Sequence, residues 1–126
     1  MQVAFVIGPY RSSKSIYEIK KNIDKAEEVA VNLWRLGYAV ICPHKNTSFF
    51  DGLLPDKVWL NGAIELLKRS DFAVTVKGWE NSAGSRDEVR YCRAAKKPLY
   101  HSNGQFNSLE ELIREDYQLK KINNQS

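Results

Sequence analysis

The chain has 126 residues, 43% of them hydrophobic and 27% charged, which is the composition of one globular domain. No apolar run approaches the length that spans a membrane, and the first apolar run is too short for a signal-peptide core. The net charge of +4 comes from 19 basic residues scattered among 15 acidic ones, which argues against a nucleic-acid partner. We therefore expect a cytoplasmic protein with one domain over residues 1–119 and a polar tail over residues 120–126.

The two cysteines, Cys42 and Cys92, lie in separate segments and form no CxxC pair. No histidine stands near them at the spacing that metal ligands require. We expect two buried free thiols, without a disulfide, a metal site or a cofactor.

The first third of the chain predicts a strand followed by a long helix. The apolar run 2–7 ends at Gly8-Pro9, which indicates a buried strand and a turn. Apolar residues then recur every three or four positions from Ile16 to Leu36, and Gly37 follows. This pattern is typical of an amphipathic helix with a glycine stop.

The middle of the chain predicts a second strand over residues 38–42, which Pro43 ends. The polar stretch that continues to Pro55 predicts a long loop, and loops of that size are usually functional or act as lids. Residues 58–69 then carry apolar side chains at helical spacing.

A third strand is predicted over residues 72–76, a helix over 84–95 and a short strand over 99–101. Ser108 is the expected cap of a last helix, with Ile113 among its inward residues. Strands that alternate with helices indicate a parallel sheet covered on both faces. We expect an α/β fold, a flavodoxin-like or Rossmann-like three-layer sandwich with about four parallel strands in the order 2-1-3-4.

The segment after the first strand, residues 8–15, has the outline of a phosphate-binding P-loop because it ends in Lys14-Ser15. However, Ser13 stands where that motif needs a glycine to wrap the phosphate. A triphosphate hydrolase is therefore disfavoured. The hydroxyls, Arg11 and free N–H groups at the helix start still suit an anion, although the serines are equally explained as helix caps.

His44 follows the second strand, and it has two interpretations. It is either an exposed loop residue or a residue of the crevice where the carboxyl ends of parallel strands meet. In the second case we expect it to hydrogen-bond a sugar or a base.

The segment that joins the third strand to the next helix contains the third candidate cluster. Gly84 allows close backbone approach, Ser82 and Ser85 offer hydroxyls, and Glu88 offers a carboxylate one turn inside the helix. The helix dipole favours the ionised form of that carboxylate, which suits either a stabilising charge or a nucleophile. The neighbouring Asp87 is the natural structural acid.

These motifs stand in a defined order over roughly residues 3–100: Gly8-Pro9-Tyr10-Arg11, Asn22 and Ala26, Pro43-His44, Leu67 through Ser70-Asp71, Ser82-x-Gly84-x-x-x-Glu88, and Ala95-x-Lys97-Pro98. Together they resemble the nucleoside 2-deoxyribosyltransferase-like superfamily, most closely a bacterial and phage branch. The resemblance implies cleavage of the N-glycosidic bond of nucleosides or nucleoside 5'-monophosphates. It places Glu88 on the catalytic glutamate, and it implies that Gly8, Tyr10, Arg11 and Ser82 hold a 5'-phosphate.

The chain also departs from that family. Its members commonly carry an aspartate in the helix before the third strand, where this chain has Gly62 or Ala63. Three other polar residues stand nearby, so the acid that protonates the leaving base is unassigned: the candidates are Asp56, Asn61 and Glu65.

The polar C-terminal tail lacks the segment with which transferases of the family complete a neighbouring active site, so hydrolysis is favoured over transfer. The family is usually dimeric or larger, and we expect a homo-oligomer. Four aromatic residues are candidates for an interface or a lid, although a buried core would also explain the tryptophans: Trp34, Trp59, Phe49 and Phe50.

The leading hypothesis is therefore a nucleotide N-glycosidase with Glu88 as nucleophile and a pocket that includes Gly8, Tyr10, Arg11 and His44, with Ser82, Gly84 and Ser85 from the third cluster. The alternatives are a nucleoside deoxyribosyltransferase and a nucleotide-binding protein or sensor without catalytic activity.

Overall fold

A computed structural model describes residues 1–10, 15–50, 52–102, 110–111 and 113–114. The elements are, in chain order, β1 (Val3–Ile7), α1 (Ile16–Arg35), β2 (Ala39–Ile41), α2 (Pro43–Asn46), α3 (Asp56–Lys68), β3 (Phe72–Thr75), the 3-10 turn η1 (Trp79–Asn81), α4 (Ala83–Ala94) and β4 (Leu99–His101). The four strands are parallel in the order β2-β1-β3-β4. The predicted fold class and strand order are confirmed.

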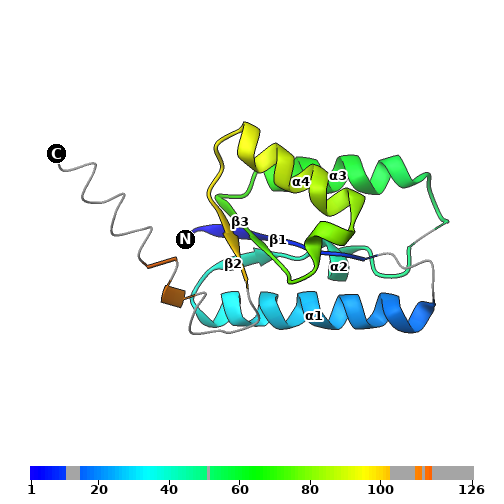
Figure 1. The fold of residues 1–126 in the computed structure, drawn as a ribbon, viewed down its shortest axis with the longest axis horizontal. Coiled ribbons are helices and arrows are strands. Elements are labelled where there is room, and N and C mark those ends of the chain that lie inside the picture. The colour runs from blue at the N-terminus through cyan, green and yellow to red at the C-terminus, as the bar shows by residue number, and fades with distance from the viewer. Residues whose placement is uncertain (11–14, 51, 103–109, 112, 115–126) are drawn as a thin grey trace.

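Helices cover both faces of this sheet, as Figure 1 shows, with α1 on one side and α3 and α4 on the other. The α1 side has a core in which Ala4 and Val6 of β1 meet Ala26, Ala30 and Leu33 of α1. The opposite side has a second core of Phe5, Ile7, Leu67, Val89 and Cys92. Alternate residues of β1 therefore point into different cores, as the pleat of a central strand requires.

Local signals explain where α1 begins and ends. The hydroxyl of Ser15 accepts a hydrogen bond from the N–H of Glu18 and caps the first turn. After Arg35 the chain reverses at Gly37, whose φ of 95° lies in the left-handed region that favours glycine. The predicted helix with its glycine stop is confirmed.

The structure corrects the expected loop after β2. Pro43 begins a four-residue helix, α2, because its fixed φ suits the first helical position and its missing N–H costs nothing there. The next helix begins at Asp56, two residues earlier than predicted. Periodicity did not reveal α2 because one turn of helix is too short to show it.

The expected buried thiols are confirmed, since Cys42 and Cys92 are both free and buried. Ile113 is also buried, in the core on the α1 side. Arg11, Ser108 and the C-terminal tail lie outside the described residues, so the predictions made for them stay predictions.

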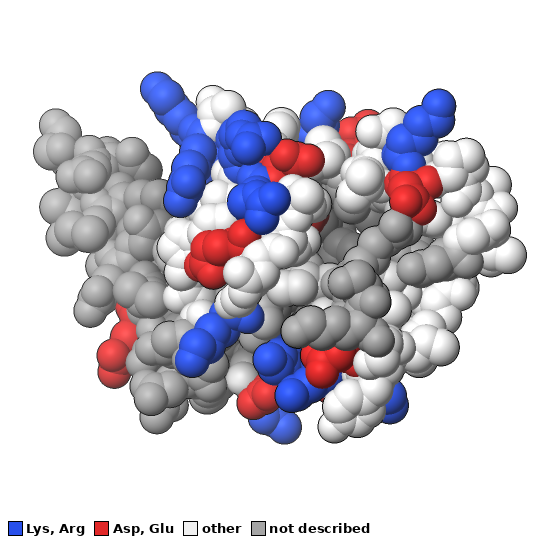
Figure 2. Space-filling model, turned by 45° about the vertical axis from the view of Figure 1, so that its right-hand side comes forward, with Lys and Arg blue, Asp and Glu red and all other residues white. Residues whose placement is uncertain are grey.

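Basic and acidic side chains of the described residues stand beside one another across the face shown in Figure 2. Ion pairs among the described residues include Lys45 with Glu27 at 3.2 Å and Arg90 with Asp87 at 2.8 Å. None of the helices in the described ranges is long and apolar enough to cross a membrane.

Candidate functional site

A cavity of about 440 Å³ opens where β1, α2, α3 and the start of α4 meet. Its volume lies in the range of small-molecule sites, and it is at the carboxyl ends of the strands, where ligands bind in parallel sheets. Its walls consist of Val6, Gly8, Tyr10, Pro43, His44, Thr47, Asp56, Trp59, Leu60, Ala63, Asn81, Ser82, Ala83, Gly84, Ser85 and Glu88.

Gly8 brings the backbone after β1 against the end of β3. A Cβ atom at Gly8 would lie 2.9 Å from both Cβ and Cγ2 of Val76, which is closer than real side chains approach. The glycine is therefore required by packing, and the carbonyl groups of Gly8 and the following Pro9 both meet the His44 ring.

His44 holds these carbonyl groups in place. Its Nε2 lies 2.9 Å from the Gly8 oxygen and 3.0 Å from the Pro9 oxygen. Both partners only accept hydrogen bonds, so Nε2 carries a proton and donates it. Burial lowers the pKa of His44, which favours the neutral ring and leaves Nδ1 to accept a weak bond from the Cys42 thiol, 3.9 Å away.

The interpretation of His44 as an exposed loop residue is wrong, because the side chain is only 4% exposed. The alternative, a residue of the crevice, is confirmed by its place in the cavity wall. Its Nε2–H already donates to the backbone carbonyl groups of Gly8 and Pro9. The structural role of His44 is therefore to position the chain after β1.

Two further contacts fix Tyr10. The side-chain amide of Asn22 in α1 donates to the Tyr10 carbonyl at 3.3 Å, and the N–H of Phe49 donates to the Tyr10 phenol oxygen at 2.6 Å. The Tyr10 ring also meets His44 edge to face, with 6.2 Å between ring centroids. Segments far apart in sequence therefore converge on the residue that follows β1.

The start of α4 forms the opposite wall. The Ser82 hydroxyl accepts a hydrogen bond from the N–H of Ser85 at 3.2 Å and caps the helix, while its own proton stays available to a ligand. Ser82, Ala83, Gly84 and Ser85 all border the cavity. The N–H groups of a first helical turn suit an anionic group there.

Glu88 lies one turn deeper in the same wall. Burial raises its pKa to about 8, and the nearby Asp87 carboxylate adds to that rise. The helix dipole was expected to keep Glu88 ionised, but desolvation outweighs it because the carboxylate has lost much of its contact with water. Glu88 is therefore mainly protonated at neutral pH in the ligand-free protein.

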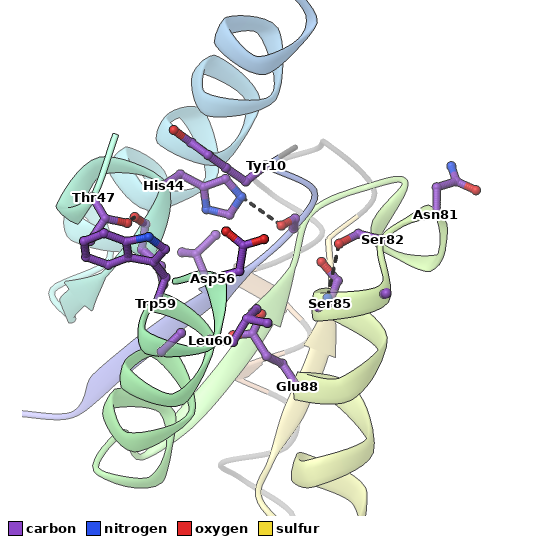
Figure 3. A pocket seen from close by; sticks show the side chains of 16 residues that line it. Tyr10, His44, Thr47, Asp56, Trp59, Leu60, Asn81, Ser82, Ser85 and Glu88 are labelled. Carbon is purple, nitrogen blue, oxygen red and sulfur yellow. Dashed lines mark hydrogen bonds between the residues drawn. The ribbon is translucent and has the colours of Figure 1, made fainter. Parts of the chain in front are cut away.

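Three buried polar atoms in this cavity lack a hydrogen-bond partner among the described residues: Trp59 Nε1, Ser85 Oγ and Glu88 Oε2. Figure 3 shows them on two sides of the space, with Trp59 on α3 and both Ser85 and Glu88 on α4. An unpaired buried polar group is costly, so their concentration in one cavity indicates a polar ligand.

A second carboxylate, Asp56, extends into the same space from the first turn of α3 (Figure 3). It lies seven residues before Ala63, so both are on one helical face, about two turns apart. Asn61 and Glu65, the other candidates for the missing acid, do not line the cavity. Of the three residues, Asp56 is thus the one that lines the cavity.

The structure brings together every candidate that it describes: Gly8, Tyr10, His44, Ser82, Gly84, Ser85 and Glu88. Arg11 lies outside the described residues. The sequence did not assign Thr47 or Asn81 to the site, and it took Trp59 for an interface, lid or core residue. The spacing of residues 56, 59, 60 and 63 at successive turns was the signal that could have linked α3 to the cavity.

No group of three or more His, Cys, Asp or Glu side chains in the described part of the chain is arranged to hold a metal ion. A scan of the chain against protein-family models finds no match, and a search of curated proteins finds no significant similarity. The family resemblance therefore stays a prediction.

Proposed function

We propose that this protein is an N-glycosidase that hydrolyses a nucleoside 5'-monophosphate, with Glu88 as the nucleophile. The observation that carries the proposal is Glu88 Oε2, which is buried in a ligand-sized cavity and has no hydrogen-bond partner among the described residues. A structural carboxylate is normally paired or solvated. An unpaired one beside a cavity is typical of an active site.

In the proposed reaction, the ionised Glu88 carboxylate attacks the anomeric carbon while the bond to the base breaks. The electron pair of that bond leaves with the base, and an ester between Glu88 and the sugar forms. The oxygen of a water molecule then bonds to the anomeric carbon, its proton passes to the group that protonated the base, and the Glu88 carboxylate leaves as the sugar phosphate is released. The raised pKa of Glu88 means that deprotonation precedes attack.

Asp56 is the proposed acid that protonates the leaving base. It lies on the α3 side of the cavity, opposite the wall that carries Glu88 (Figure 3). A nucleophile and an acid on opposite sides of the scissile bond is the arrangement that glycosidases use. Members of the resembling family carry an aspartate at about the position of Ala63, which has no carboxyl group. In this assignment Asp56, in the first turn of the same helix, takes over its role.

The 5'-phosphate is proposed to lie against the first turn of α4. There Ser82, Ala83 and Gly84 line the cavity at the N-terminus of the helix, where hydroxyl and backbone N–H groups suit an anion. Gly8 and Tyr10 border the same space from β1, and the family resemblance adds Arg11. None of the described lining residues is Lys or Arg. In this proposal the phosphate is therefore bound by the N-terminus of α4 and by Arg11.

The proposed site of action is the cytoplasm, and the proposed assembly is a homo-oligomer. Exposed apolar side chains gather in α3 and the segment before it: Phe49, Phe50, Leu53, Leu54, Val58, Leu60 and Leu66. Burial of such residues favours self-association. Light scattering after size-exclusion chromatography tests this, with a mass of 14.5 kDa expected only for a monomer.

The test of the function is release of free base from a panel of nucleosides and their 5'-monophosphates, followed by chromatography. Glu88→Gln keeps the shape but removes the nucleophile, so we expect turnover to fall by about 10³-fold or more. Glu65→Gln is the matched control, because Glu65 is exposed and pairs with Arg69 away from the cavity.

Binding of nucleotide without any release of base, in wild type and Glu88→Gln alike, would instead support the binding-protein alternative. Formation of a new nucleoside when a second base is added would identify a transferase, because that base would then compete with water for the glycosyl ester.

A further inference from the structure

Ser85 is the most deeply buried polar residue of the cavity wall. It is 1% exposed, and its Oγ has no hydrogen-bond partner among the residues that the structure describes. Its backbone is fixed, since its N–H donates to the Ser82 hydroxyl that caps α4. The hydroxyl therefore occupies a set position, and neither the cap nor the packing of the described residues uses it.

Ser85 and Glu88 are neighbours on one helical face. They are three residues apart in α4, so they lie on successive turns with a rise of about 4.5 Å between them. Both border the cavity, and both carry a buried polar atom that is unpaired within the described ranges. In Figure 3 their side chains extend from α4 toward the same space. Each of the two residues thus presents one buried polar atom in the wall of the same cavity, where a ligand with two polar groups would satisfy both.

The stereochemistry of the proposed reaction determines which groups of the sugar face the α4 wall of the cavity. A nucleophile attacks the anomeric carbon from the side opposite the leaving base. In a nucleoside both ring hydroxyls lie on that side, and the 2'-hydroxyl is attached to the carbon next to the reacting one. Glu88 therefore approaches the sugar on its hydroxyl-bearing face, and Ser85 lies beside Glu88 on the same wall.

We propose that Ser85 makes this protein selective for ribonucleotides over 2'-deoxyribonucleotides by hydrogen bonding to the 2'-hydroxyl of the sugar. This inference rests on the proposed function and adds the sugar class to it. A ribose offers two adjacent hydroxyls to the buried polar atoms of Ser85 and Glu88. A deoxyribose leaves one of these buried atoms without a partner.

The discrimination follows from the cost of an unpaired buried group. A site that is built to hydrogen-bond a hydroxyl rejects an analogue without it much more strongly than an apolar pocket rejects a missing methylene. Contacts to this hydroxyl also strengthen as charge develops on the sugar in the transition state. We therefore expect the ratio of kcat/KM for ribo- over deoxyribonucleotide to be about 10²-fold or more.

The experiment compares matched pairs of ribo- and 2'-deoxyribonucleoside 5'-monophosphates that carry the same base. Ser85→Ala removes only the hydroxyl, so we expect it to lower kcat/KM for the ribonucleotide at least tenfold and to leave the deoxyribonucleotide nearly unchanged. Ser70→Ala is the matched control, because Ser70 is also a buried serine but its hydroxyl donates to the Leu66 carbonyl at 2.9 Å outside the cavity. The control should keep the wild-type ratio.

A second measurement separates this inference from the proposed function. Calorimetry in the Glu88→Gln background gives the dissociation constants of the same nucleotide pairs, with and without Ser85→Ala. A ribose preference that disappears with Ser85 supports the inference even if base release fails. Turnover that depends on Glu88 but shows no Ser85-dependent preference overturns the inference and leaves the proposed function intact. Absence of both binding and turnover overturns both.

Discussion

The two faces of the sheet are covered by helices of very different character. On one face, α1 buries five of its residues, Ile23, Ala26, Val29, Ala30 and Leu33. On the other face, α3 has thirteen residues and only Leu67 is buried. Both helices carry apolar side chains at helical spacing, so the sequence pattern alone makes them look equivalent.

The difference teaches where stability and ligand recognition are located. The α1 face is a continuous apolar core, whereas the α3 and α4 face encloses the cavity in which Trp59, Ser85 and Glu88 leave buried polar atoms unpaired within the described residues. Such groups reduce the stability of a fold, and they are tolerated where a ligand pairs with them. We therefore expect mutations on the two faces to separate stability from binding.

The largest expected effect on stability is that of Leu33→Ala. Leu33 is fully buried against the sheet, so its truncation leaves a cavity and should lower the free energy of unfolding by about 2–5 kcal/mol. Leu60→Ala is the matched change on α3, where the side chain is 52% exposed and borders the site. We expect it to cost less than about 1 kcal/mol and to raise KM for the substrate.

Urea denaturation of both variants measures these values. Equal destabilisation by the two substitutions would mean that α3 is packed as firmly as α1, for example by a second copy of the chain. In that case dilution of the protein should weaken the effect of Leu60→Ala.

Much of the scaffold could be predicted from local patterns. The apolar runs, the serine cap of α1 and the stop at Gly37 each act over a few residues, so periodicity and capping rules locate them. The order of the four strands also followed, because parallel strands joined by right-handed crossovers leave few arrangements.

The site was predictable only in part. Ser82 to Glu88 form one local segment that chemistry could single out, but Asp56 and Trp59 come from a helix whose spatial neighbour is set by tertiary packing. The raised pKa of Glu88 was unpredictable for the same reason, since it depends on burial by residues distant in sequence.

The next effect concerns the protonation of Glu88 and the pH dependence of stability. Its pKa is about 8 in the folded protein, against 4.5 for an unperturbed glutamate. Between these two values the folded state binds more protons than the unfolded state, so stability falls as pH rises and levels off above pH 8. We expect a loss of up to about 5 kcal/mol over that range.

Glu88→Gln cannot ionise, so it should remove most of this decline and be more stable than wild type at pH 9. Thermal unfolding at a series of pH values measures the difference. If the melting temperatures of the two proteins changed with pH in the same way, Glu88 would already be ionised in the folded state. Burial would then not be what raises its pKa.

The same ionisation should appear in the rate of base release. With the proposed acid removed by Asp56→Asn, a nucleophile that must lose its proton makes kcat/KM rise with pH, about tenfold per unit below pH 8, with a plateau above it. The Glu65→Gln control should follow the wild-type profile. A profile that is flat from pH 5 to pH 9 would contradict the assignment of Glu88 as the attacking group in the free enzyme.

The smallest expected effect comes from a pair of glycines on the cavity side of the molecule. Gly8→Ala introduces a Cβ atom 2.9 Å from two atoms of Val76, so the chain after β1 must shift. We expect a loss of about 1–3 kcal/mol in stability from this overpacking. The shift would also move the carbonyl groups that His44 holds, so substrate affinity should fall as well.

Gly62→Ala is the opposite case, because a Cβ atom there meets no other atom within 4 Å and the residue lies inside α3. Alanine in a helix is favoured over glycine, so this variant should gain about 0.5–1 kcal/mol with unchanged KM. The two substitutions add the same methyl group, and denaturation with substrate titration compares them directly. If Gly8→Ala proved neutral in both measurements, the chain after β1 would be adaptable, and the role of His44 in positioning it would have to be abandoned.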